Sequence, residues 1–117
     1  MPRTSRKRPN ELTSDWPAAP SDVLAGEYAR RFAVRLRDVI GDGSVRALGR
    51  DADVAPGAIR RIIEGQTWPD LSTIAKLEST LGEVLWPTGV EGVRYETTTA
   101  GKSWWRSSES TAEAGRR

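Results

Sequence analysis

Apolar residues recur at helical spacing between residues 43 and 69, in two short runs separated by a turn. In the first run, Val45, Leu48 and Ala52 fall on one face at spacings of three and four, as in an amphipathic helix. Ser44 stands directly before this run, and its side chain can accept a hydrogen bond from a free N–H of the first turn. The pattern therefore predicts a short helix that begins after Ser44.

A second run begins at Pro56, which suits the first helical turn because its missing N–H would have no partner there. Ile59, Ile62 and Ile63 mark an apolar face, and Gly65 can end the helix in a left-handed conformation. Two helices separated by so few residues must cross steeply, which predicts a helix-turn-helix arrangement. The expected core residues of this unit are Leu48, Val54, Ile59 and Ile62.

Longer helices are predicted on both sides of this unit. The first runs from about Ser21 or Ala25 to Ile40, and the last begins after the N-cap Asp70 and ends at Gly82. The apolar stripe of the first helix consists of Leu24, Tyr28, Phe32, Leu36, Val39 and Ile40. The stripe of the last helix consists of Leu71, Ile74, Leu77 and Leu81, after which Val84, Leu85 and Trp86 are expected to close the core.

Both ends of the chain lack helical periodicity. Residues 1–20 are rich in Arg, Lys, Pro, Ser and Thr and are predicted to form a disordered basic arm, in which Trp16 and Pro17 make a turn. Two roles fit this arm: contact with DNA phosphates or a minor groove, or a solubilising tail. Residues 88–117 form a C-terminal tail, in which residues 93–106 fit either a short β-hairpin or an unstructured segment. The part after Ser107 is interpreted as unstructured.

The composition sets limits on the architecture and the chemistry. A chain of 117 residues with 37% hydrophobic content fits one small domain. We expect an all-α bundle of four to five helices over residues 21–87, with flexible tails. Cys and His are both absent, which excludes disulfides, His-based metal sites and His general bases. No cofactor, metal or enzymatic activity is therefore expected, and the lack of a long apolar run or a secretory signal favours the cytoplasm.

The formal net charge of +2 is unevenly distributed along the chain. Residues 1–50 carry 10 basic and 6 acidic side chains, whereas residues 51–87 carry 3 basic and 6 acidic ones. Basic charge therefore concentrates in the N-terminal arm and the first two predicted helices. One face of the molecule is expected to attract phosphate while another repels it.

The motif between residues 44 and 69 resembles that of the lambda-repressor-like, or Xre/Cro, helix-turn-helix family. The residues that stand at the family's spacings are Ser44, Leu48, Ala52, Val54, Ile59, Ile62, Gly65 and Pro69. The chain departs from the family pattern at Val45 (usually Gln), Gly49 (Ala), Asp53 (Gly), Ala55 (Ser), Arg60 (Ser) and Ile63 (Glu). Asp tolerates the left-handed turn conformation, so the change at Asp53 is mild. The loss of the Gln matters more, because it commonly holds a phosphate in relatives.

The resemblance implies a sequence-specific regulator of transcription that binds double-stranded DNA, acts as a repressor and forms a homodimer. Its second motif helix, residues 56–64, would enter the major groove. The expected base contacts are Pro56, Gly57, Arg60 and Arg61. The expected phosphate contacts are Ser44, Arg46, Arg50, Gln66 and Thr67. Arg61 is the preferred base reader, because a guanidinium can pair bidentately with guanine O6 and N7.

Each candidate also has a structural interpretation. Arg60 or Arg61 could pair with Asp53 or Glu64, and Arg46 and Arg50 could lie on a solvated face. On the first helix, Arg30, Arg31, Arg35 and Arg37 fit a solvated face, although Arg31 and Arg35 could also touch phosphate. Trp68 could pack on the end of the bundle or lie beside a sugar-phosphate.

A second class of function stays open. The same bundle would also suit a protein-interaction module, because a fold alone does not fix a function. In a toxin–antitoxin pair, Trp104 and Trp105 would belong to a tail that folds on a protein partner. Control of a phage, a mobile element or a chromosomal gene is equally compatible with the sequence.

Overall fold

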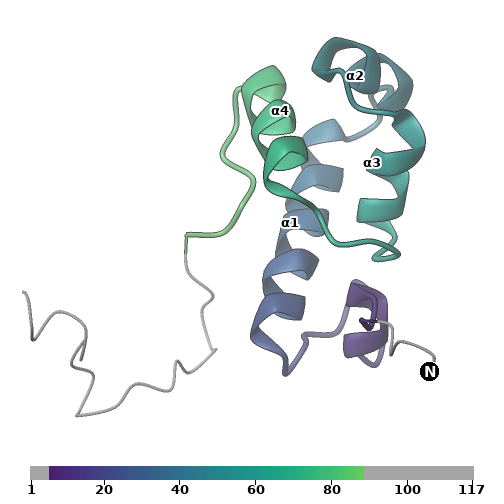
Figure 1. Cartoon of the computed structure of the whole chain (residues 1–117), viewed down its shortest axis with the longest axis vertical. Coiled ribbons are helices and arrows are strands. Elements are labelled where there is room, and N and C mark those ends of the chain that lie inside the picture. Colours follow the sequence, from purple (N-terminus) through teal and green to yellow (C-terminus); the bar gives the residue numbers. More distant parts are fainter. Residues whose placement is uncertain (1–5, 89–117) are drawn as a thin grey trace, which may run out of the picture.

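The longest helix, α1 (Leu24–Ile40), contributes Phe32 and Leu36 to the core, and the segment before it and the third α-helix pack directly on it. In the computed structural model, which describes residues 6–88, it is followed by α2 (Val45–Ala52), α3 (Pro56–Ile63) and α4 (Leu71–Leu81). A short 3-10 helix, η1 (Pro9–Leu12), precedes them and lies beside the lower end of α1 in Figure 1. Residues 6–88 contain these helices and no strand, which confirms the predicted all-α class. None of these helices is both long and apolar enough to cross a bilayer.

The predicted helix ends are confirmed. The Ser44 hydroxyl accepts a hydrogen bond from the Ala47 N–H at 3.0 Å, and an Asp70 carboxylate oxygen accepts one from the Thr73 N–H at 2.8 Å. Gly65 follows α3 with a φ of 72°, and Gly82 follows α4 with a φ of 67°. Local sequence signals therefore set the starts of α2 and α4 and the ends of α3 and α4.

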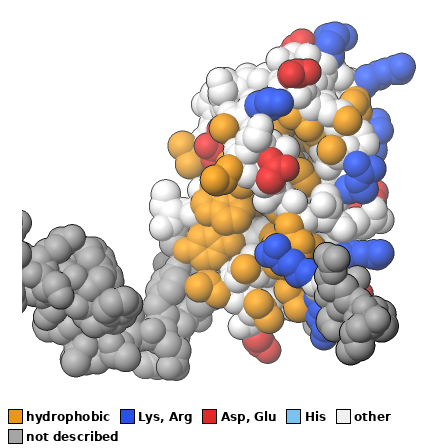
Figure 2. Space-filling model, viewed as in Figure 1, with side chains coloured by type: hydrophobic (Ala, Val, Ile, Leu, Met, Phe, Trp, Pro, Cys, Tyr) orange, Lys and Arg blue, Asp and Glu red, His pale blue; other side chains and the backbone are white. Residues whose placement is uncertain are grey.

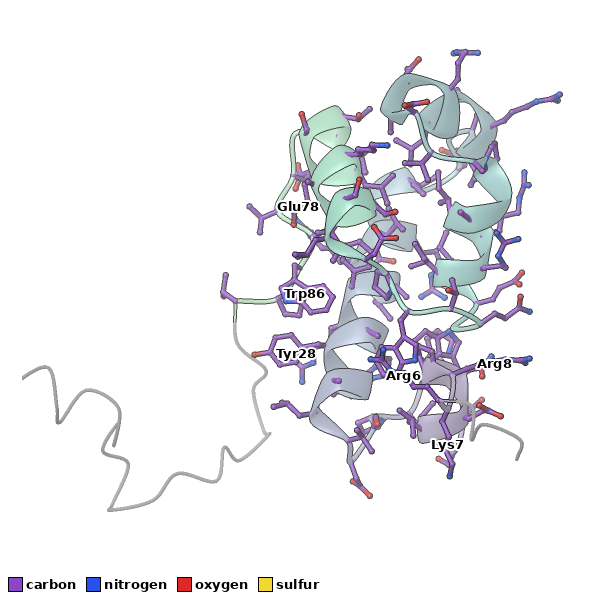
Figure 3. All side chains as sticks on the ribbon, in the orientation of Figure 1. Arg6, Lys7, Arg8, Tyr28, Glu78 and Trp86 are labelled. Carbon is purple, nitrogen blue, oxygen red and sulfur yellow. The ribbon has the colours of Figure 1, made fainter. Side chains whose placement is uncertain are left out.

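The core forms where the apolar faces of the four α-helices meet. Its buried members are Phe32, Leu36, Leu48, Ala52, Ile59, Ile62, Leu77 and Leu85. The Glu78 carboxylate accepts the backbone N–H groups of Leu85 at 2.7 Å and Trp86 at 2.9 Å, so the chain after α4 turns back onto the bundle (Figure 3). Trp86 then stacks on α1, with its ring centroid 5.5 Å from that of Tyr28.

Some residues predicted to be buried lie elsewhere. Leu71 is 85% exposed and Val84 is 68% exposed, so neither belongs to the core. At about 100° per residue, Leu71 is turned by about 120° from Leu77, which places it off the buried face of α4. Leu24 is 41% exposed at the start of α1, and Val54 is only partly buried in the turn between α2 and α3.

The prediction of a disordered arm over residues 1–20 is wrong for residues 6–20. Pro9 is buried, η1 packs on α1, and Trp16 anchors this segment to α3 instead of merely forming a turn. The physical reason is that the segment supplies hydrogen-bond donors to the end of α3, as described below. Residues 1–5, the predicted hairpin at 93–106 and the tail after Ser107 lie outside the described residues.

A buried carboxylate ties the N-terminal segment to α1. Glu27 is 1% exposed, and its carboxylate accepts hydrogen bonds from Arg30 Nε at 2.8 Å, Arg31 Nε at 2.8 Å and the Ser21 N–H at 2.8 Å. The hydrogen bond from Arg30 is the largest influence on this group. With the bonds from Arg31 and Ser21, it outweighs the cost of burial and lowers the pKa of Glu27 to about 2. Glu27 therefore stays charged in the folded protein at neutral pH, and its hydrogen bond from Ser21 holds the N-terminal segment against α1.

Candidate nucleic-acid interface

The turn between α2 and α3 is tight. Asp53 has a left-handed conformation, with φ 60° and ψ 48°, and the Val54 N–H donates to the Gly49 carbonyl at 2.9 Å. Pro56 then begins α3. Lys76 on α4 places Nζ 3.3 Å from the Asp53 carbonyl oxygen and 3.8 Å from its carboxylate. The turn is thus held both by its own backbone hydrogen bond and by the contacts of Lys76 from α4.

Gly49 allows α2 to approach this turn closely. A Cβ atom at Gly49 would lie 2.5 Å from the Val54 carbonyl oxygen and 3.0 Å from Pro56 Cγ. The first of these atoms belongs to the backbone, so it cannot move aside without shifting α3. This close approach accounts for Gly at a position where the resembled family usually has Ala.

We predict that Gly49→Ala lowers the free energy of unfolding by about 2 kcal/mol, because an added methyl group in a tightly packed site forces the backbone to move. Urea unfolding measures this change. Gly57→Ala is the matched control: its Cβ would meet only Arg61 Nη1, at 3.5 Å. Ala is a better helix former than Gly, so the control is expected to be neutral or slightly stabilising. Equal losses in both variants would contradict the predicted clash.

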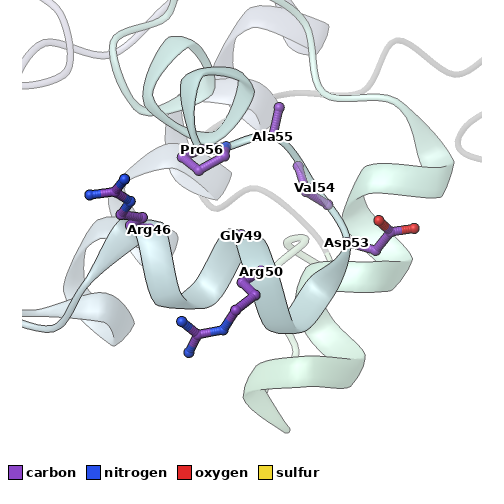
Figure 4. Close-up of a pocket in the computed structure, with 7 residues that line it drawn as sticks. All are labelled: Arg46, Gly49, Arg50, Asp53, Val54, Ala55 and Pro56. Atoms are coloured by element: carbon purple, nitrogen blue, oxygen red, sulfur yellow. The ribbon is translucent and has the colours of Figure 1, made fainter.

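A shallow hollow of about 570 Å³ opens between α2 and the start of α3 (Figure 4). Its lining residues are Arg46, Gly49, Arg50, Asp53, Val54, Ala55 and Pro56. Arg46 and Arg50 are one turn apart on α2, and both are exposed. Arg50 Nε is 3.4 Å from an Asp51 carboxylate oxygen, but both side chains are well exposed, so this pair is weak. Two guanidinium groups are thus available to an anion at this edge.

The candidate base-contact residues lie together along α3. Pro56 and Gly57 are partly buried in its first turn, whereas Arg60 and Arg61 are exposed in its last turn. Neither arginine forms an ion pair or a side-chain hydrogen bond with any residue in the described range 6–88. Asp53 pairs with Lys76 instead, so the structure does not show the alternative in which Arg60 or Arg61 pairs with Asp53 or Glu64.

The phosphate candidates lie at both ends of α3. Arg46, Arg50 and Ser44 belong to α2 and its cap, next to the start of α3, whereas Gln66 and Thr67 follow its end. Figure 2 shows Lys and Arg side chains along the right-hand edge of the molecule, over α2 and α3 and below them. The Ser44 hydroxyl already accepts the Ala47 N–H, so only its own hydrogen is available to an added acceptor.

Arg31 and Arg35 of α1, the two that could touch phosphate by pattern, are engaged elsewhere. Arg31 binds Glu27, and Arg35 Nη2 lies 2.6 Å from a Glu83 carboxylate oxygen. Arg35 also borders a hollow beside residues 84–88, on the opposite side of the molecule from α3 (Figure 1). These arginines therefore do not extend the basic edge formed by α2 and α3.

The sequence patterns did not predict that the N-terminal segment lies at the end of α3. Trp16 Nε1–H donates to the Ile63 carbonyl at 2.9 Å, and Asn10 Nδ2–H donates to the Glu64 carbonyl at 3.1 Å. A signal in the sequence is Trp16, a large aromatic residue in an otherwise polar stretch. Trp68 packs on this segment, because its Nε1–H donates to the Lys7 carbonyl at 2.8 Å.

No protein-family model matches the chain, and neither a curated protein nor a solved structure matches it. The likeness to the lambda-repressor-like family accordingly stands on the motif residues between 44 and 69.

Proposed function

We propose that the chain is a sequence-specific regulator of transcription, which binds double-stranded DNA with α2 and α3 acting as a helix-turn-helix. One observation carries the proposal: Arg60 and Arg61 are exposed and unpaired within residues 6–88, on a helix whose opposite face is buried through Ile59 and Ile62. A helix held in this way can enter a major groove without disturbing the core.

In the proposed complex, α3 enters the groove with its N-terminus first. Pro56 and Gly57 carry no side-chain donors, and their small surfaces let the helix approach the base edges closely. Arg61 reads a guanine through O6 and N7, and such a bidentate pair discriminates against other bases by about 1–3 kcal/mol. Arg60 lies about 100° away on the helix and contacts the margin of the groove.

Phosphate contacts fix the position of α3 without reading sequence. Arg46 and Arg50 bind the backbone beside the start of α3, and Gln66 and Thr67 bind it beyond the end. The Ser44 hydroxyl donates its hydrogen to a phosphate oxygen, while it keeps its capping role. The protein acts in the cytoplasm as a homodimer on two half-sites about 34–36 Å apart, and it represses by occupying a promoter.

The test is fluorescence anisotropy on two labelled duplexes, one selected from a randomised pool by the wild-type protein and one scrambled. Arg61→Ala is expected to weaken binding to the selected duplex by about tenfold to a hundredfold and to the scrambled duplex much less, because a base contact is lost. The matched control is Arg37→Ala, which removes an exposed arginine from α1. Failure of the wild-type protein to bind either duplex at low salt would contradict the proposed function.

A further inference from the structure

The N-terminal segment caps the end of α3. The last carbonyls of an α-helix have no donor within the helix. Here Trp16 Nε1–H binds the Ile63 carbonyl at 2.9 Å, Asn10 Nδ2–H binds the Glu64 carbonyl at 3.1 Å, and the Asn10 N–H binds the Gly65 carbonyl at 3.0 Å. We call this set of hydrogen bonds the clasp. It joins residues more than forty positions apart, so it fixes where the N-terminal segment lies relative to α3.

Gly65 makes the clasp possible. A Cβ atom at this position would lie 2.6 Å from Trp16 Cε2 and 2.8 Å from Asn10 Cβ, so only a glycine leaves room for both side chains. Beyond Gly65, the Trp68 Nε1–H donates to the Lys7 carbonyl, and the Arg6 guanidinium lies 4.2 Å from the centroid of the Trp68 ring. Residues 6–10 therefore follow the loop that joins α3 to α4.

The clasp places three consecutive cations, Arg6, Lys7 and Arg8, at the end of α3. Arg6 is engaged with Trp68, whereas Arg8 is exposed and forms no ion pair with any residue between 6 and 88. The Arg8 N–H donates to the Glu11 carboxylate at 2.7 Å, which holds the backbone at this position. In Figure 3, Arg8 points to the same side of the molecule as the nitrogen-tipped side chains of α3, while Lys7 points downward.

We propose that Arg8 is a phosphate-binding residue of the DNA interface, held beside the end of α3 by the clasp. The inference rests on the proposed function and adds an ordered N-terminal contact to it. The Lys7 carbonyl is bound to Trp68 and the Asn10 N–H to Gly65, on either side of Gln66 and Thr67, so in the proposed complex Arg8 binds the backbone that borders the groove occupied by α3. Because the segment is already ordered, the contact forms without the entropic cost of ordering a free arm.

The experiment measures the affinity of the full chain for the selected and scrambled duplexes over a salt series. Each phosphate contact contributes about 0.9 to the slope of log affinity against log salt. Arg8→Ala is expected to reduce that slope by about 0.9 and to weaken binding to both duplexes by the same factor, because phosphates carry no sequence information. Arg35→Ala is the control, since it removes an exposed arginine on the opposite side of the molecule.

A second variant tests the clasp itself. Asn10→Ala combined with Trp16→Phe removes both side-chain hydrogen bonds of the clasp and leaves every cation of the chain unchanged. We expect it to weaken binding several-fold at each salt concentration with an unchanged slope, because the segment must then be ordered on binding. Circular dichroism is measured on each variant, so that affinities are compared between folded proteins. An affinity equal to that of the wild-type protein would overturn the role of the clasp.

The outcomes separate this inference from the proposed function. If wild-type binding depends on salt and on Arg61, but Arg8→Ala and Arg35→Ala have the same slope, the Arg8 contact is overturned and the proposed function stands. If the wild-type protein binds no duplex at low salt, the proposed function fails and the Arg8 contact fails with it. A loss for Arg8→Ala confined to the selected duplex would assign Arg8 to base reading and overturn its role as a phosphate contact.

Discussion

Glu27→Gln is expected to lower the free energy of unfolding by about 3 kcal/mol, because it removes a buried negative charge and leaves the partly buried guanidinium groups of Arg30 and Arg31 without their counter-charge. The Glu27 carboxylate is bound by Arg30, Arg31 and the Ser21 N–H, and no buried side-chain nitrogen or oxygen in residues 6–88 is without a partner. A glutamine amide keeps the size of the side chain, so the loss reports on charge. Chemical unfolding in urea at neutral pH measures it.

The same group predicts a dependence of stability on pH. Its pKa is about 2 in the folded protein and 4.5 in the unfolded chain, so the unfolded chain binds a proton first as the pH falls. The stabilisation is fully present above pH 4.5 and is lost as the pH falls toward 2, and a shift of this size corresponds to about 3 kcal/mol.

Unfolding measured between pH 6 and pH 2.5 tests this dependence. The wild-type protein should lose much more stability over this range than Glu27→Gln does. Asp70 contributes equally in both proteins, since the Thr73 amide lowers its pKa in each. Asp51→Asn is the control variant, because its carboxylate is exposed and, among residues 6–88, forms an ion pair only with exposed Arg50. Parallel pH profiles for the wild-type protein and Glu27→Gln would contradict the assignment.

Gly65→Ala is expected to lower the free energy of unfolding by about 3 kcal/mol. Part of the loss, about 1 kcal/mol or slightly more, comes from the positive φ of 72°, which L side chains adopt at a cost. The rest arises because the new Cβ would lie 2.6 Å from the Trp16 ring and displace it, which breaks the hydrogen bond to Ile63 and exposes apolar surface.

Gly82→Ala separates these two contributions. Gly82 has a φ of 67°, and a Cβ there would meet no atom within 4 Å, so this variant carries the backbone cost alone. Thermal or urea unfolding of the two variants should show the larger loss for Gly65→Ala. Equal losses would mean that Trp16 does not pack against Gly65 in solution.

A second substitution tests whether Gly65→Ala breaks the hydrogen bond of Trp16. If it does, Trp16→Phe should cost less stability in the Gly65→Ala variant than in the wild-type protein, because that hydrogen bond is already broken.

Sequence patterns predict the local features of the candidate site but not its long-range contacts. The turn, its left-handed Asp53, the start of α3 at Pro56 and the exposure of Arg60 and Arg61 follow from residues within one or two helical turns of each other. The ionic partner of Arg35 does not, because Glu83 lies 48 positions away along the chain. By pattern, Arg31 and Arg35 fit a solvated face and could also touch phosphate; Arg31 pairs with Glu27 one turn earlier on α1, whereas folding places Glu83 beside Arg35.

Two features of the N-terminal half also depended on tertiary packing. Residues 6–20 have the composition of a disordered arm, but the end of α3 presents carbonyls that Asn10 and Trp16 satisfy. Glu27 binds Arg30 and Arg31 one turn later on its own helix, but its burial and its hydrogen bond from the Ser21 N–H depend on how the preceding segment lies against α1. In each case a hydrogen-bond partner lies in a different segment of the chain, so the contact forms only when the N-terminal segment folds back onto the helices.

Apolar periodicity and capping act between residues close along the chain, so the all-α class, the four helices and the N-caps of α2 and α4 could be predicted from the sequence. Tertiary contacts were needed to establish that Glu83 neutralises Arg35, which residues of the apolar stripes stay exposed, and that the N-terminal segment closes on α3. Those outcomes depend on contacts between distant residues such as Trp16 and Ile63, whose free energy is gained only when the helices have already come together.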